Sequence, residues 1–85
     1  MKKFDYTITD ELGIHARPAG MLVKEAAKFE ADVIIECKDK SGDAKRIFTV
    51  MGMGIKQNDT VTVNINGVDE VDAKEALEEF FKNNL

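Results

Sequence analysis

Alternation of apolar and polar residues predicts strands at both ends of the chain. Residues 4–9 place Phe4, Tyr6 and Ile8 between Asp and Thr residues, and residues 60–66 alternate more regularly. A period of two is typical of strands with one buried and one solvent-facing side. A third strand is predicted over residues 32–38, which have a β-branched centre. Ser41-Gly42-Asp43 has turn composition, so we expect a short strand over residues 44–46 to fold back as a hairpin.

Three segments have the patterns of helices. Residues 16–29 carry an apolar stripe, and residues 47–53 are apolar on nearly every side until Gly52 and Gly54 interrupt them. Asp69 is predicted to cap a last helix. The order β-α-β-β-α-β-α predicts an α+β open-faced sandwich, a four-stranded antiparallel sheet with three helices on one face, in one domain over residues 1–85. The inward positions of the first and last helices are Ala19, Leu22, Val23, Ala26 and Phe29, then Ala73, Leu77, Phe80 and Phe81.

The composition narrows the classes of function. The net charge is −4, which argues against nucleic acid as a partner because a phosphate backbone requires a basic surface. No stretch is apolar enough to cross a membrane, and Met1-Lys2-Lys3 is followed by a strand pattern and not by the core of a signal peptide, so we expect a cytoplasmic protein. With one histidine and one cysteine, a metal site is not expected, nor is a cofactor. Cys37 lies in an alternating apolar run and is predicted to be a small buried hydrophobe.

The only histidine, His15, lies where a strand pattern changes into a helix pattern. Backbone N–H groups at a helix start have no intrahelical partner and attract anions, here those of Ala16 and Arg17. Arg17 adds a planar guanidinium that matches phosphate oxygens, and Pro18 fixes where the first turn begins. From the residues alone, a phosphate-carrying role and a plain structural role, as a cap or a solvated side chain, both remain open.

The segment Gly13-Ile14-His15-Ala16-Arg17-Pro18-Ala19 resembles the active-site segment of HPr, the histidine phosphocarrier family of the bacterial phosphoenolpyruvate-dependent sugar phosphotransferase system. The resemblance covers nearly the whole chain, with Lys45–Gly54 in register with the second helix of the family. It implies the strand order 1-4-2-3 and a monomer. It also implies that Nδ1 of His15 takes a phosphoryl group from enzyme I, that Arg17 and the N–H groups of Ala16 and Arg17 hold it, and that a sugar-specific enzyme IIA receives it. The protein would be a stoichiometric carrier rather than an enzyme.

Two apolar features exceed what the core requires. Met21 lies off the buried stripe toward His15, and the segment 47–53 has more apolar surface than one buried face uses. An exposed apolar cluster beside a charged site is typical of a partner surface. Val50 is predicted to be core, whereas the resemblance implies that the patch docks donor and acceptors. The predicted partner-binding residues are Met21, Lys24, Ile47, Phe48 and Met51, with transcriptional regulators as a further class of partner.

Arg46 departs from the family pattern. Gram-positive relatives have at this position a serine that a regulatory kinase phosphorylates, so that control is not expected here. Smaller departures near the predicted docking face are Leu12, Gly20, Thr49 and Gly52. Together with Arg46, these departures leave open the alternative that the protein is a regulatory binding module of the same fold, which acts by association with partners alone. An α+β ligand- or RNA-binding domain is disfavoured, because the chain has no aromatic pair on a basic strand and no glycine-rich nucleotide loop.

Overall fold

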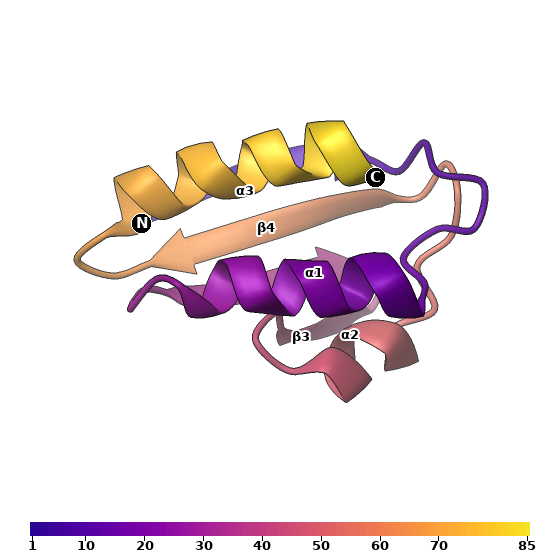
Figure 1. The fold of residues 1–85 in the computed structure, drawn as a ribbon, viewed down its shortest axis with the longest axis horizontal. Coiled ribbons are helices and arrows are strands. Elements are labelled where there is room, and N and C mark those ends of the chain that lie inside the picture. Colours follow the sequence, from indigo (N-terminus) through magenta and orange to yellow (C-terminus); the bar gives the residue numbers. More distant parts are fainter.

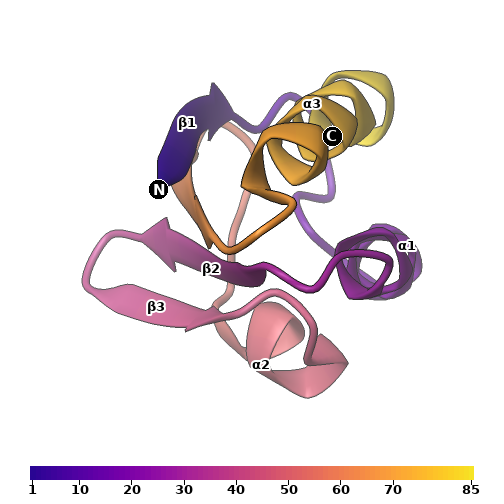
Figure 2. The same ribbon diagram turned by 90° about the vertical axis from the view of Figure 1, so that its left-hand side faces the viewer.

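The computed structural model describes residues 1–85 and has the predicted order of elements. The four strands form one antiparallel sheet in the order β1-β4-β2-β3, as the resemblance implied. All three helices cover the same face of this sheet, which confirms the open-faced sandwich (Figures 1 and 2). The elements are β1 (Lys2–Thr7), α1 (Ala16–Ala27), β2 (Asp32–Cys37), β3 (Lys40–Asp43), α2 (Ile47–Gly52), β4 (Thr60–Asn66) and α3 (Glu70–Asn84).

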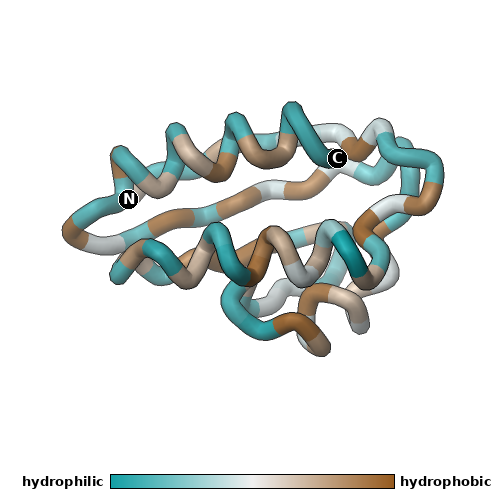
Figure 3. Tube along the Cα trace, viewed as in Figure 1, coloured by the Kyte–Doolittle hydropathy of each residue, from teal (hydrophilic) through white to brown (hydrophobic).

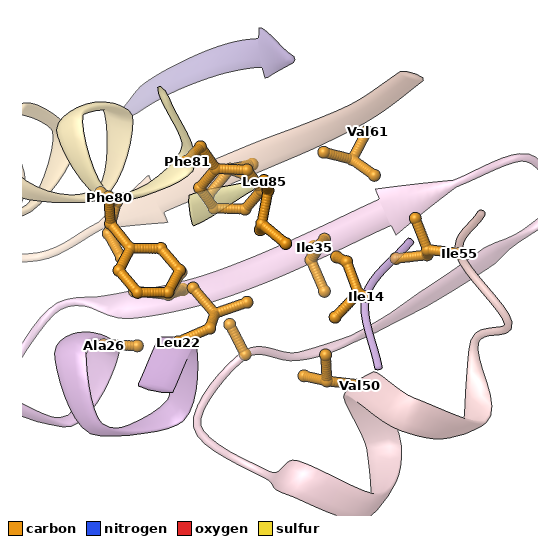
Figure 4. Close-up of a cluster of buried hydrophobic side chains, with 14 of the residues drawn as sticks. Ile14, Leu22, Ala26, Ile35, Val50, Ile55, Val61, Phe80, Phe81 and Leu85 are labelled. Carbon is orange, nitrogen blue, oxygen red and sulfur yellow. The ribbon is translucent and has the colours of Figure 1, made fainter. Parts of the chain in front are cut away.

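The core lies between the sheet and the helices. On the inner face of the sheet, Val63 of β4 pairs with Phe4 of β1 and with Ile35 of β2. Phe81 of α3 is completely buried, and its ring packs edge-on against Phe4, with 5.6 Å between the ring centroids. Figure 4 shows side chains from α1, α3 and the strands meeting in this cluster. The positions of the first and last helices that were predicted to face inward are buried. Val23 and Phe29 are the exceptions, because they are only partly buried at the margin of the core.

The hydropathy of the chain follows this arrangement. Apolar and polar segments alternate along β4 and α3 (Figure 3). On the outer face of the sheet, side chains form polar cross-strand pairs instead of a second core: the Thr62 hydroxyl donates to Asp5, and the Asn64 amide donates to Glu36. One face of the sheet is therefore left open to solvent, as period-two alternation predicts.

The hairpin between β2 and β3 differs from the prediction. Cys37 pairs with Lys40, so the turn is at residues 38–39, and the segment expected to turn forms β3 itself. Lys38 adopts a positive φ of 57° to make this tight turn. Gly42 is needed in the strand for a different reason, because a Cβ there would collide with Cγ2 of Thr49. The glycine of this segment thus reflects close packing under α2 and not a turn.

Asp69 immediately precedes α3, as predicted, but its side chain does not cap that helix. Its two carboxylate oxygens accept the backbone N–H groups of Glu30 and Ala31, each at 2.9 Å. The Glu70 carboxylate instead accepts the Gly67 N–H at 3.1 Å. Asp69 therefore joins the start of α3 to the segment between α1 and β2, two regions far apart in the sequence.

Candidate functional site

The loop between β1 and α1 positions His15. Ile8 and Ile14 are buried at its two ends, and the Ile14 N–H donates to the Ile55 carbonyl oxygen at 3.1 Å. Gly13 has a φ of +66°, and a Cβ at this position would collide with the same carbonyl oxygen. Figure 4 shows Ile14 and Ile55 facing each other at the edge of the core. The loop is thus fixed to the segment before β4, and it delivers His15 to the start of α1.

His15 occupies the N-cap position of α1 with an extended backbone, but its side chain makes no capping hydrogen bond. Its carbonyl oxygen accepts the Ala19 N–H at 2.9 Å, so the backbone alone starts the helix. The side chain is 38% exposed to solvent. Ala16 and Arg17 open the helix with N–H groups that have no intrahelical acceptor, and Pro18 has no N–H. The alternative that His15 serves as a cap is therefore wrong.

A surface pocket of about 290 Å³ contains three of the predicted site residues, whereas Ala16, Lys24, Ile47, Phe48 and Met51 do not line it. The Arg17 side chain lies in it without an ion-pair or hydrogen-bond partner within the chain, so its guanidinium is available to an anion. Of the sequence-predicted residues, His15, Arg17 and Met21 meet here. The pocket is lined by Asp10, His15, Arg17, Pro18, Met21 and Asn84.

Asp10 and Asn84 are pocket residues that the sequence analysis did not identify. Oδ2 of Asp10 lies 4.0 Å from Nε2 of His15. Asn84 reaches the pocket from the end of α3, where the Thr9 and Asp10 N–H groups donate to the Leu85 carbonyl oxygen at 2.6 and 2.9 Å. Neither contact follows from hydrophobic periodicity. An acidic residue a few positions before the histidine was the only available signal for Asp10.

The predicted docking residues divide between exposed and half-buried positions. Phe48 and Met51 of α2 are exposed, as are Met21 and Lys24 of α1, whereas Val50 is buried as predicted. The prediction that Ile47 is exposed is wrong, because its side chain packs against the core and lies over Gly20. α2 packs beside α1, the helix that begins directly after His15 (Figure 1).

Comparisons with known proteins show the family of this chain. Residues 2–83 match the family model described as "PTS HPr component phosphorylation site". The chain belongs to the HPr family. The phosphocarrier protein HPr of Mycoplasma capricolum is 42% identical to this HPr chain over 79 residues, which are 93% of this chain and 89% of that protein.

Solved HPr structures share the same fold. The histidine-containing phosphocarrier protein of a Mycoplasma aligns with a TM-score of 0.94 at 39% identity, over 96% of this HPr chain and 93% of its own. Crh of Bacillus subtilis, a catabolite repression protein described as a swapped, intertwined dimer, aligns with a TM-score of 0.78 at 31% identity. The alignment covers 94% of this chain and 92% of Crh. The match to a phosphocarrier extends over the whole sheet and all three helices.

Two other expectations about this HPr chain can be compared with the structure. Cys37 is buried on β2, as predicted, and burial raises the pKa of its thiol, which disfavours the reactive thiolate. No helix combines the length and the apolar character needed to span a membrane.

Proposed function

We propose that this HPr family member carries a phosphoryl group on His15, between enzyme I and sugar-specific enzyme IIA proteins. The observation that carries the proposal is an uncapped, partly exposed imidazole at the start of α1, in one pocket with an unpaired Arg17 guanidinium. A helix N-terminus and an arginine both favour an incoming dianion. The protein acts as a stoichiometric carrier in the cytoplasm and is not itself an enzyme.

The transfer requires positioning rather than covalent activation. A neutral ring nitrogen of His15, Nδ1 by resemblance to the family, attacks the phosphorus of a phosphohistidine on enzyme I. The new N–P bond forms while the donor N–P bond breaks, and the donor ring leaves as neutral imidazole. Arg17 and the N–H groups of Ala16 and Arg17 hold the phosphoryl oxygens. A histidine of enzyme IIA then removes the group by the same exchange.

Docking uses the exposed apolar residues of α1 and α2. Met21 lines the pocket, and Phe48 and Met51 present apolar surface from α2. Ile47 supports this surface from its half-buried position, and Lys24 adds a positive charge on α1. Methionine side chains adapt to differently shaped partners, which suits a carrier that binds both a donor and several acceptors.

The test is reconstitution with purified enzyme I and phosphoenolpyruvate. We expect one acid-labile, base-stable phosphoryl group per chain, which then moves to an enzyme IIA on its addition. Absence of labelling under conditions where a known HPr becomes labelled would contradict the proposal.

A second candidate is a regulatory module that binds partners without carrying phosphate. Arg46 at the start of α2 and the structural similarity to Crh favour it. The presence of both His15 and Arg17 in the pocket argues against this candidate, because association alone requires neither a phosphate acceptor nor a phosphate-binding guanidinium. In the same assay, such a module would bind enzyme I or a regulator but would not pass a phosphoryl group to enzyme IIA.

A further inference from the structure

Asp10 is the only acidic residue among those that line the His15 pocket. Its Oδ2 lies 4.0 Å from Nε2 of His15, and both side chains are about one-third exposed. This separation is too long for a direct hydrogen bond, so the carboxylate acts on the ring through its charge. The carboxylate faces one particular ring nitrogen, which makes the two nitrogens of His15 inequivalent.

The position of this carboxylate is fixed by the loop. Oδ1 of Asp10 accepts the Leu12 N–H at 2.9 Å, and its carbonyl oxygen accepts the Gly13 N–H at 3.0 Å. The Asp10 N–H donates to the Leu85 carbonyl oxygen at 2.9 Å. With Oδ1 occupied by the turn, Oδ2 is the oxygen left to face the imidazole. Asp10 is thus held from both ends.

We propose that Asp10 is a positioning residue that directs phosphorylation of His15 to Nδ1 and away from Nε2. This inference rests on the proposed function in taking His15 as the acceptor. A negative charge near Nε2 favours the tautomer with the proton on Nε2 and the lone pair on Nδ1. The same charge repels a phosphoryl dianion from Nε2.

The Asp10 carboxylate also favours the Nδ1 adduct after the phosphoryl group has been transferred. Once Nδ1 bonds to phosphorus, the ring retains its Nε2 proton and carries a positive charge that faces Asp10. Arg17 is the other charged side chain lining the pocket beside His15, and α3 contributes only the neutral Asn84 amide. Asp10 therefore supplies the negative charge near the phosphorylated ring, while Arg17 is available to the phosphoryl oxygens.

Phosphoramidate provides a test that does not depend on any protein partner. Its P–N bond breaks as a ring nitrogen attacks, and ammonia leaves. We compare the wild-type chain with Asp10→Asn, whose amide oxygen still accepts the Leu12 N–H but lacks the charge. Asp39→Asn is the matched control, because it removes the same charge from the exposed β2–β3 turn. NMR of protein labelled with ¹⁵N-histidine separates the Nδ1 and Nε2 adducts.

We expect wild type and Asp39→Asn to form the Nδ1 adduct predominantly. In Asp10→Asn the Nε2 share rises about two- to fivefold, the range for a partly exposed charge pair. Addition of 1 M salt should shift the wild-type ratio toward that of Asp10→Asn. Melting temperatures should be unchanged, which separates a charge effect from a distorted loop.

An unchanged adduct ratio in Asp10→Asn, or an equal shift in Asp39→Asn, would overturn the role of Asp10. A parallel reaction with enzyme I keeps the two proposals apart. If wild type forms the Nδ1 adduct with phosphoramidate but accepts nothing from enzyme I, the relay is wrong and the role of Asp10 stands.

Discussion

Phe48 and Val50 lie two residues apart on α2, yet Phe48 is 86% exposed and Val50 is completely buried. The six residues of this helix thus attach it to the core through one side and present an aromatic ring to solvent on another. A phenylalanine that stays exposed contributes little to folding. It indicates a surface kept for a partner.

Replacement of Phe48 by Asp should therefore impair docking and leave folding intact. Its side chain buries little area, so we expect the free energy of unfolding to change by less than about 0.5 kcal/mol. Affinity for enzyme I should fall about tenfold or more, because a charge would be desolvated within an apolar contact. Met51→Asp should weaken the same contact at a larger cost in stability, because Met51 is only 39% exposed. Titration calorimetry and thermal melting measure the two effects.

The chain offers a matched control for this prediction. Val68, in the turn before α3, is 85% exposed, and its replacement by Asp should change neither stability nor affinity. Equal loss of affinity in Val68→Asp and Phe48→Asp would show that added negative charge, rather than a lost contact on α2, weakens binding.

His15→Ala should fold normally and accept no phosphoryl group. The ring makes no capping bond and is partly exposed, so its removal costs little packing. Incubation with enzyme I and labelled phosphoenolpyruvate, followed by mass spectrometry, measures the result. Persistent label on the variant would place the acceptor elsewhere in the chain.

Arg17→Lys should slow phosphorylation by about tenfold without changing the melting temperature. Lysine keeps the charge but lacks the planar pair of donors that matches phosphate oxygens. Stopped-flow labelling by enzyme I measures the rate. If both proteins react equally fast, the helix N-terminus suffices and the guanidinium has no special role.

Asp69 predicts a specific loss of stability in acid. The backbone N–H groups of Glu30 and Ala31 donate hydrogen bonds that lower the pKa of its carboxyl below the usual 3.8, and the bond from Glu30 has the larger effect. Because the folded-state pKa lies below the unfolded one, the stabilisation is complete above the unfolded pKa. It is lost as the pH falls through the folded-state pKa.

Asp69→Ala should consequently melt at a lower temperature than wild type at pH 7, and the difference should shrink as the pH falls below about 4. Melting curves between pH 2 and pH 7 measure it. Asp72→Ala, on the exposed side of the same helix, is the control. A difference between wild type and Asp69→Ala that stays constant across this range would contradict the assignment.

The sequence predicted those parts of the fold that depend on local periodicity. The alternation that places Val61, Val63 and Ile65 inward identified β4, and Leu77 with Phe81 identified the buried side of α3. Three details of the fold were predicted wrongly, because they depend on contacts between segments that are distant in the sequence. Thr49 covers Gly42, Asp69 binds the segment before β2, and Ile47 packs over Gly20.

The site was predicted only to the extent that its residues are close in sequence. His15 and Arg17 are two positions apart at the start of a helix, where the free backbone N–H groups favour an anion. Asp10 and Asn84 join them through an irregular loop and the far end of the chain. Hydrophobic periodicity does not predict contacts of this kind, so the negative charge of Asp10 beside His15 is seen only in the folded chain.

The position of β4 between β1 and β2 has a consequence for biosynthesis. Of the three strands that precede it, only β2 and β3 pair with each other, so β1 has no partner until Thr60–Asn66 has left the ribosome. Nascent chains shorter than this expose the unpaired edges of β1 and β2 together with the core residues that precede β4. Folding must therefore follow the synthesis of roughly the first three-quarters of the chain. The last strand to be made joins β1 to the hairpin of β2 and β3.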